Sequence, residues 1–203
     1  MTTLCGRARQ RAPSGVNGDA RHTRRHGMAW SKTPWSAKNG LGFGLVAGLV
    51  FALAECLASL LGGTGVLEPL RYAASVVLGS RALMDMPLGL TAFAGLGVHL
   101  LLAAFFGLAY SLVDARMAME LRPQGAHQAA MGMLFALGIW GVTFQFVARG
   151  HYPWFLSVPQ FFQLVLHAVF YGLPLGLLFA MAERRRVALA EFEERTLEER
   201  TPR

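Results

Sequence analysis

Four long blocks of apolar residues alternate with shorter polar stretches along the chain. Each block has about 20 or more mainly apolar residues, which is the length that an α-helix needs to cross the hydrocarbon core of a bilayer. The blocks cover residues 40–62, 88–113, 128–148 and 161–181. Their apolar residues are not confined to one helical stripe, as they would be in a surface helix of a soluble protein. The pattern predicts an all-α integral membrane protein built as a four-helix transmembrane bundle.

The stretch between the first two blocks, residues 63–87, is too polar and too broken to span a membrane. Glu68 and Pro69 are typical of a helix start, because proline fits the first turn and an acidic side chain favours the positive end of the helix dipole. We therefore expect a short interfacial helix on the outer face of the membrane. It is either a linker that covers the mouth of the bundle or a lid over a cavity below it.

The two ends of the chain are polar. Residues 1–38 are basic and low in apolar residues, which predicts a disordered N-terminal tail. Met28 opens a segment with tryptophan and lysine residues typical of a membrane-protein start, so we expect native translation to begin there and to leave out residues 1–27. Residues 184–203 are charged and helix-prone, which predicts a cytoplasmic helical tail beyond a transmembrane domain of residues 39–183.

The formal net charge of +7 comes from basic residues that flank the apolar blocks. Four spans place both termini on one side, and that side carries 16 of the 19 Lys and Arg residues; the other three are Arg71, Arg81 and Arg149. The positive-inside rule then places both termini in the cytoplasm. We expect a multi-pass protein of a bacterial-type cytoplasmic (inner) membrane. Charges at membrane borders also favour the lipid bilayer, and not nucleic acid, as the partner.

Each predicted span carries polar residues at a similar depth. Counted from the outer ends at about 1.5 Å per residue, they lie in the outer half of the membrane or near its midplane. They are Glu55, His99, Gln145, His167 and Tyr171. An unpaired charge on Glu55 would cost a few kcal/mol at that depth, so its carboxyl group should be protonated or paired with a histidine. These residues predict one intramembrane polar cluster.

Several uses of this cluster remain open. As a structural network it would fix the helix register, with each contact contributing about 1 kcal/mol. As a path for protons or a solute it would use Glu55 and the two histidines, since both residue types change protonation readily. His99 and His167 could instead ligate a b-type haem, or join Glu55 at a metal ion. The spacing motif of a metal site is absent, so no cofactor is predicted.

Glycines predict where the spans approach one another. Gly40, Gly44 and Gly48 repeat the GxxxG spacing, which lets a second helix come close in lipid. Gly95 shares the side of His99 in the second block, and Gly138 and Gly141 share the side of Gln145 in the third. We expect all six glycines to pack against neighbouring helices.

The function classes follow from these features. No serine stands in a G-x-S-x-G context, and nothing else predicts an enzyme. The sequence favours a structural, accessory or stress-related membrane protein. A proton-linked small-solute transporter or channel component is the first alternative, and it would need a homo-oligomer or a larger membrane complex because four helices are few. A membrane protein that binds haem b or a metal ion is the second.

The order of features also resembles the YagU-like family of small bacterial inner-membrane proteins. The resemblance covers residues 40–182 and is carried by four stretches: GLVAGLVFALAE, GVHLLLAAFFGLAY, HYPWFLSVP and FFQLVLHAVFYG. It implies a helical inner-membrane protein with a suggested link to acid tolerance. It implies no catalytic residue.

Overall fold

The structure, a computed structural model, describes residues 37–200, and all regular secondary structure in this range is helical. Four helices are long and apolar enough to cross a membrane: Ala37–Leu61, Leu88–Asp114, Gly125–His151 and Gln160–Leu197. The predicted all-α four-helix bundle is therefore confirmed. The start at Met28 and nearly all of the predicted N-terminal tail lie outside the described residues.

The first two spans are regular α-helices, whereas the last two each contain a π-helical segment, which is a wide helical turn. Helices α1 (Ala37–Leu61) and α3 (Leu88–Asp114) are α-helical throughout. The third span joins α4 (Gly125–Trp140) to the π-helical segment η3 (Gly141–Ala148) and the short α5 (Arg149–His151). In the fourth span α6 (Gln160–Leu166) leads through the π-helical segment η5 (His167–Gly172) into α7 (Leu173–Arg200).

Pro174 explains the wide turn in the fourth span. Proline has no backbone N–H to donate, and its ring clashes with the carbonyl group one turn earlier in a regular α-helix. The π-helical turn directly before Leu173 loosens the backbone at this point, which is one of the recognised ways in which a helix accommodates a bend. The third span has no proline in η3, and its wide turn has no equally simple cause in the sequence.

Three short helices connect the spans. The predicted interfacial helix is present as α2 (Glu68–Leu78), with proline in its first turn. It is followed by η2 (Ser80–Leu83), and a second short turn, η4 (Pro153–Ser157), joins the third and fourth spans. Helix α2 packs on α3, because Gly95 has no side chain and lets the Leu70 carbonyl group lie against it.

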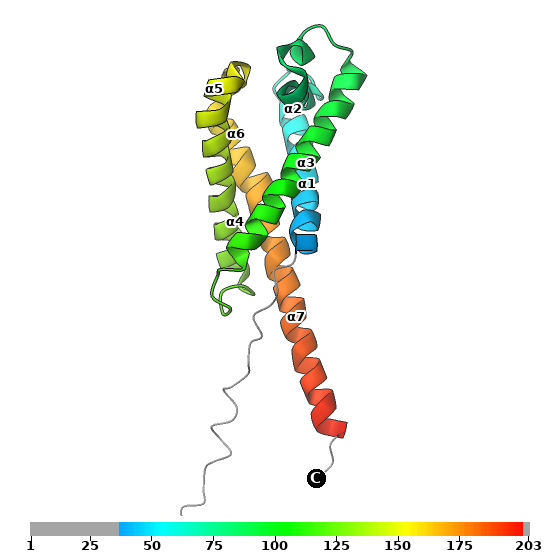
Figure 1. The fold of residues 1–203 in the computed structure, drawn as a ribbon, viewed down its shortest axis with the longest axis vertical. Helices are drawn as coiled ribbons and strands as arrows, with labels where there is room; N and C mark the ends of the chain where they lie inside the picture. Colours follow the sequence, from blue (N-terminus) through cyan, green and yellow to red (C-terminus); the bar gives the residue numbers. More distant parts are fainter. Residues whose placement is uncertain (1–36, 201–203) are drawn as a thin grey trace, which may run out of the picture. The chain divides into compact units, whose positions relative to one another are not determined.

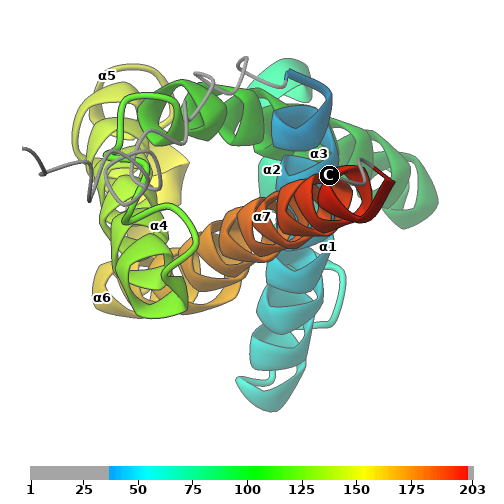
Figure 2. The same cartoon turned by 90° about the horizontal axis from the view of Figure 1, so that it is seen from below.

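The spans form two pairs. Helices α1 and α3 cross closely, and α4 packs along η5 and α7; the pairs meet through contacts of α1 with η5 and α7. Figure 1 shows the pairs separating toward the end that carries α2, η4 and α5, which we call the α2 end. Helix α7 extends beyond the opposite end, which we call the tail end. Viewed from the tail end, α7 crosses in front of α1 (Figure 2).

Glycines allow the α1–α3 crossing, as the GxxxG spacing predicts. A methyl group added at Gly40 or Gly44 would overlap the backbone of Gly107 or Ala103, and one added at Gly48 would overlap the Ala103 side chain. The two backbones are therefore in direct contact, an arrangement that gives helices good van der Waals packing in lipid.

A second glycine contact joins α4 to the fourth span. Gly132 lies against the backbone of Gly172 and Gly176, so that any side chain there would overlap backbone atoms. In contrast, a methyl group added at Gly138 or Gly141 would meet nothing within 4 Å. The structure thus places these two glycines away from the helix contacts, because α4 turns the face that carries Gly132 toward α7.

Near the tail end, the bundle is held by a buried polar network that the sequence did not predict. The Tyr110 hydroxyl group donates to Oε1 of Gln128 at 2.7 Å, and Nε2 of Gln128 donates to Oδ1 of Asp114 at 2.6 Å. The Arg122 guanidinium group donates to Oδ2 of Asp114, also at 2.6 Å. All four side chains are buried. The network ties α3, the following connection and α4 together.

Candidate functional site

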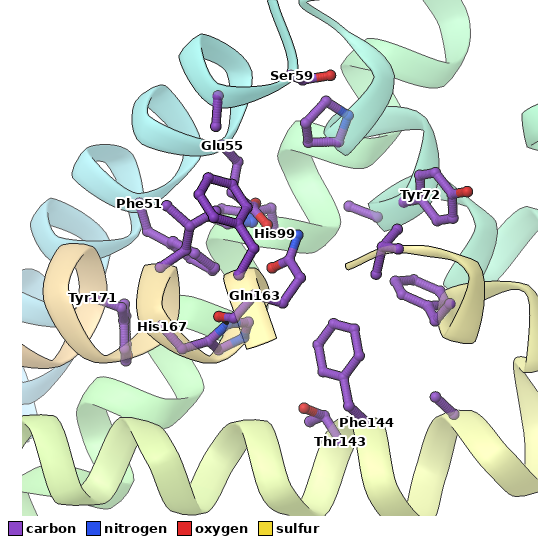
Figure 3. Close-up of a pocket in the computed structure, with 18 of the residues that line it drawn as sticks. Phe51, Glu55, Ser59, Tyr72, His99, Thr143, Phe144, Gln163, His167 and Tyr171 are labelled. Atoms are coloured by element: carbon purple, nitrogen blue, oxygen red, sulfur yellow. Dashed lines mark hydrogen bonds between the residues drawn. The ribbon is translucent and has the colours of Figure 1, made fainter. Parts of the chain in front are cut away.

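A cavity of about 770 Å³ lies between the two helix pairs, in the half of the bundle nearer the α2 end. Its walls come from α1, α2, α3, η3, η4, α6 and η5, so segments from every span contribute. Most lining side chains are apolar, and many are aromatic. Figure 3 shows Glu55, His99, Gln163 and His167 gathered on one side of it, facing Thr143 and Phe144 on the other.

The connections at the α2 end meet over this cavity. The hydroxyl groups of Tyr72 on α2 and Ser157 on η4 are 3.0 Å apart. The indole N–H of Trp154 donates to Oγ of Ser75 at 2.8 Å. These bonds link the two helix pairs, and Tyr72 also lines the cavity. Of the two roles predicted for the interfacial helix, covering a cavity agrees with this position.

Three side chains in the polar group are oriented by hydrogen bonds. Nε2 of His99 donates to the Gly48 carbonyl at 2.9 Å, and Nδ1 of His167 donates to the Gln163 carbonyl at 2.7 Å. Because a carbonyl oxygen can only accept, these contacts fix which nitrogen of each ring carries the proton. The Gln163 side-chain amide donates to the Glu55 carboxyl group. Glu55 itself is half-buried at the cavity wall.

Phe51 separates the two imidazole rings. Its ring centroid lies 5.4 Å from that of His99 and 4.6 Å from that of His167. The imidazoles are thus neighbours across a phenyl ring, and Nε2 of His99, the nitrogen that would face a haem iron, is held by a backbone carbonyl. The residues present do not fit a haem shared by the two histidines. Among residues 37–200, no group of three or more His, Cys, Asp or Glu side chains could hold a metal ion.

The other two predicted cluster residues lie elsewhere. The Tyr171 hydroxyl group donates to the Ala103 carbonyl at 2.8 Å, so it ties η5 to α3 beside the cavity. Gln145 accepts hydrogen bonds from the Arg149 side chain and does not line the cavity. The reason is which face of the third span meets the other helices: Gln145 shares the side of Gly138 and Gly141, which faces open space, whereas Thr143, Phe144, Val147 and Ala148 line the cavity.

Sequence reasoning did not select two residues that shape the site. Gln163 lies one helical turn before His167, so the stripe that carries His167 contains it. Phe51 lies one turn before Glu55, and among many apolar residues nothing distinguishes it. Choosing the wall residues of η3 requires knowing which face of the third span meets the other helices, and the sequence does not show this.

Four apolar helices of membrane length make the chain a polytopic helical membrane protein. The cavity with its carboxyl, amide and imidazole groups is the feature that a function must use. Comparison with protein-family models, with curated proteins and with solved structures finds no match. The resemblance to the YagU-like family stays a prediction.

Proposed function

We propose that the protein binds a small, mainly apolar molecule in the cavity between its two helix pairs. The observation that carries the proposal is the cavity itself, about 770 Å³ in volume, apolar over most of its walls, with a few convergent polar groups on one side. Ligand pockets have this size and this mixture of lining groups. Bundle-core sites built from facing helices are also common in helical proteins.

A purely structural role suits the tail half better than the cavity. There, short hydrogen bonds join four buried side chains, and glycines bring backbones into contact. Around Glu55 the pattern differs, since Oε1 of Gln163 is buried and has no hydrogen-bond partner among the described residues. A structural network would be expected to satisfy its buried acceptors. This difference supports binding over an accessory role based on the cluster.

The proposal places the protein in a bacterial-type cytoplasmic membrane, with both termini in the cytoplasm. Its support is the distribution of basic residues, 16 on the side of the termini and three on the other. In this orientation the cavity occupies the outer half of the membrane, and α2 lies over it at the outer surface. A ligand would then reach the cavity from the outer leaflet or from outside the cell.

Blocking the cavity tests the proposal. Thr143 lines the cavity, whereas Val142 beside it is 57% exposed on the outside of the same segment. We expect native mass spectrometry of protein in mild detergent to find a small molecule on the wild type and on V142W. We expect T143W to have lost it, because the indole group fills the space that the molecule needs.

Two results would count against binding. One is a wild-type protein that carries no small molecule. The other is a T143W protein that keeps the molecule as V142W does. Matching thermal unfolding of the two variants controls for damage to the fold.

Proton-linked transport is a second candidate. It is favoured by the position of the cavity in one half of the bundle, with the other half closed by packed side chains. Glu55 and the neighbouring imidazoles supply groups that exchange protons. In proteoliposomes with a trapped pH-sensitive dye, we expect an imposed proton gradient to dissipate through the wild type and not through Glu55→Gln. Equal rates for both would exclude this candidate.

A further inference from the structure

The polar groups of the cavity are mainly hydrogen-bond acceptors. The hydroxyl groups of Ser59, Thr143 and Tyr171 already donate to backbone carbonyls of the protein. The described residues that line the cavity include no lysine and no arginine. Most hydrogen-bond donors in the cavity wall are therefore already bonded to other groups of the protein.

The acceptors, in contrast, are left over. Oε1 of Gln163 is buried and has no partner among residues 37–200. Since Nε2 of His99 and Nδ1 of His167 are the donors to carbonyl groups, the other nitrogen of each neutral ring is an acceptor. No described group is bonded to either of these two nitrogens. A molecule that satisfies this side of the cavity must bring its own N–H or O–H groups.

The charged and aromatic groups at the site also favour a ligand that donates hydrogen bonds. Two carboxyl groups line the cavity, and Glu68 is paired with Arg71 at 3.1 Å. Glu55 has only the neutral Gln163 amide as its polar partner, so the protein supplies no cation to pair with its carboxyl group. The surrounding rings of Phe51, Tyr72 and Phe144 add negative π-faces, which also favour a cation.

We propose that the cavity takes an apolar amine, a molecule with a mainly hydrocarbon body and a protonated nitrogen whose N–H groups bind Glu55 and the acceptors beside it. This inference rests on the proposed function and names the class of its ligand. The aromatic walls enclose the hydrocarbon body, while the Glu55 carboxyl group and the acceptor nitrogens of the two imidazole rings receive the hydrogen bonds.

Three probes with the same phenylbutyl body and different head groups test which class of ligand the cavity binds. They are 4-phenylbutylamine, 4-phenylbutanol and 4-phenylbutyrate, titrated calorimetrically into the full chain in zwitterionic lipid nanodiscs, with heats from empty nanodiscs subtracted. A hydrogen bond to a charged group is worth enough to change affinity about tenfold or more. We expect the amine to bind at least about tenfold more tightly than the alcohol, and the carboxylate to show no binding.

A pair of matched variants tests whether Glu55 binds the amine. Glu55→Gln keeps the shape of the side chain and removes its charge, so we expect the amine to lose about tenfold in affinity or more while the alcohol is unchanged. Glu120→Gln makes the same change at an exposed carboxyl group that does not line the cavity, and should leave both probes unaffected.

The outcomes separate this inference from the proposed function. Tighter binding of the alcohol or the carboxylate to the wild type overturns the amine class while showing that the cavity binds ligands, and this comparison needs no variant. Equal losses in both variants also overturn it. No binding of any probe, together with a co-purified molecule that T143W lacks, overturns the class alone. No binding and no co-purified molecule overturn both.

Discussion

Replacing Gly132 by leucine is expected to prevent the third and fourth spans from packing. Gly132 lies against the backbone of Gly172 and Gly176, and backbone atoms cannot move aside as a flexible side chain can. Overpacking of a tight core contact costs about 3 kcal/mol, and here the helices must separate to make room. We expect little folded protein by size-exclusion chromatography in detergent, and a much lower midpoint of thermal unfolding for what remains.

Gly138→Leu is the matched control on the same helix. Position 138 was a predicted packing residue, yet a side chain there meets open space in the structure. Leucine is also a better helix former than glycine, by up to about 1 kcal/mol. We therefore expect the stability of this variant to equal or exceed that of the wild type. If both leucine variants were equally damaged, or Gly132→Leu were harmless, the α4–α7 contact would be wrong.

Asp114→Ala is expected to have the second-largest effect. The Asp114 carboxylate receives hydrogen bonds from Arg122 and Gln128 at 2.6 Å each, and both members of the ion pair are buried. Removing one partner of a buried ion pair leaves the other charge without compensation, which costs about 3–5 kcal/mol. The midpoint of thermal unfolding should fall accordingly, and the connection between α3 and α4 should become sensitive to added protease.

Glu68→Ala provides the comparison for this effect. The Glu68–Arg71 pair is also close, at 3.1 Å, but its side chains are 28% and 20% exposed, and exposed pairs contribute about 0–1 kcal/mol. We expect only a small change in the unfolding midpoint. A loss of stability as large as that of Asp114→Ala would show that burial does not decide the strength of these pairs.

The sequence determined the spans well because membrane insertion depends on properties that composition records directly. Length and hydropathy define all four blocks, and Glu68 and Pro69 mark the start of α2 correctly. The GxxxG contact of Gly44 and Gly48 also follows from spacing alone, since a straight α-helix keeps such residues on one face.

The site was less predictable because it depends on helix phase and pairing. Gln145 was assigned to the cluster together with the face of Gly138 and Gly141, but the third span turns the face of Thr143 toward the cavity instead. The Asp114–Arg122 pair was not predicted, since nothing in the local sequence shows that the chain folds back there. Glu55, His99 and His167, which were grouped by depth alone, all line the cavity.

The central claim is that a ligand cavity lies between the two helix pairs, with Glu55 in its wall. The most direct measurement is an experimental structure of the full chain, purified in lipid nanodiscs, at a resolution that shows side chains. The account predicts density for a bound molecule enclosed by α1, α3, η3 and α6, in contact with Glu55 and Gln163. Helix pairs packed together so that side chains fill this space, or a Glu55 side chain directed at the lipid, would contradict it.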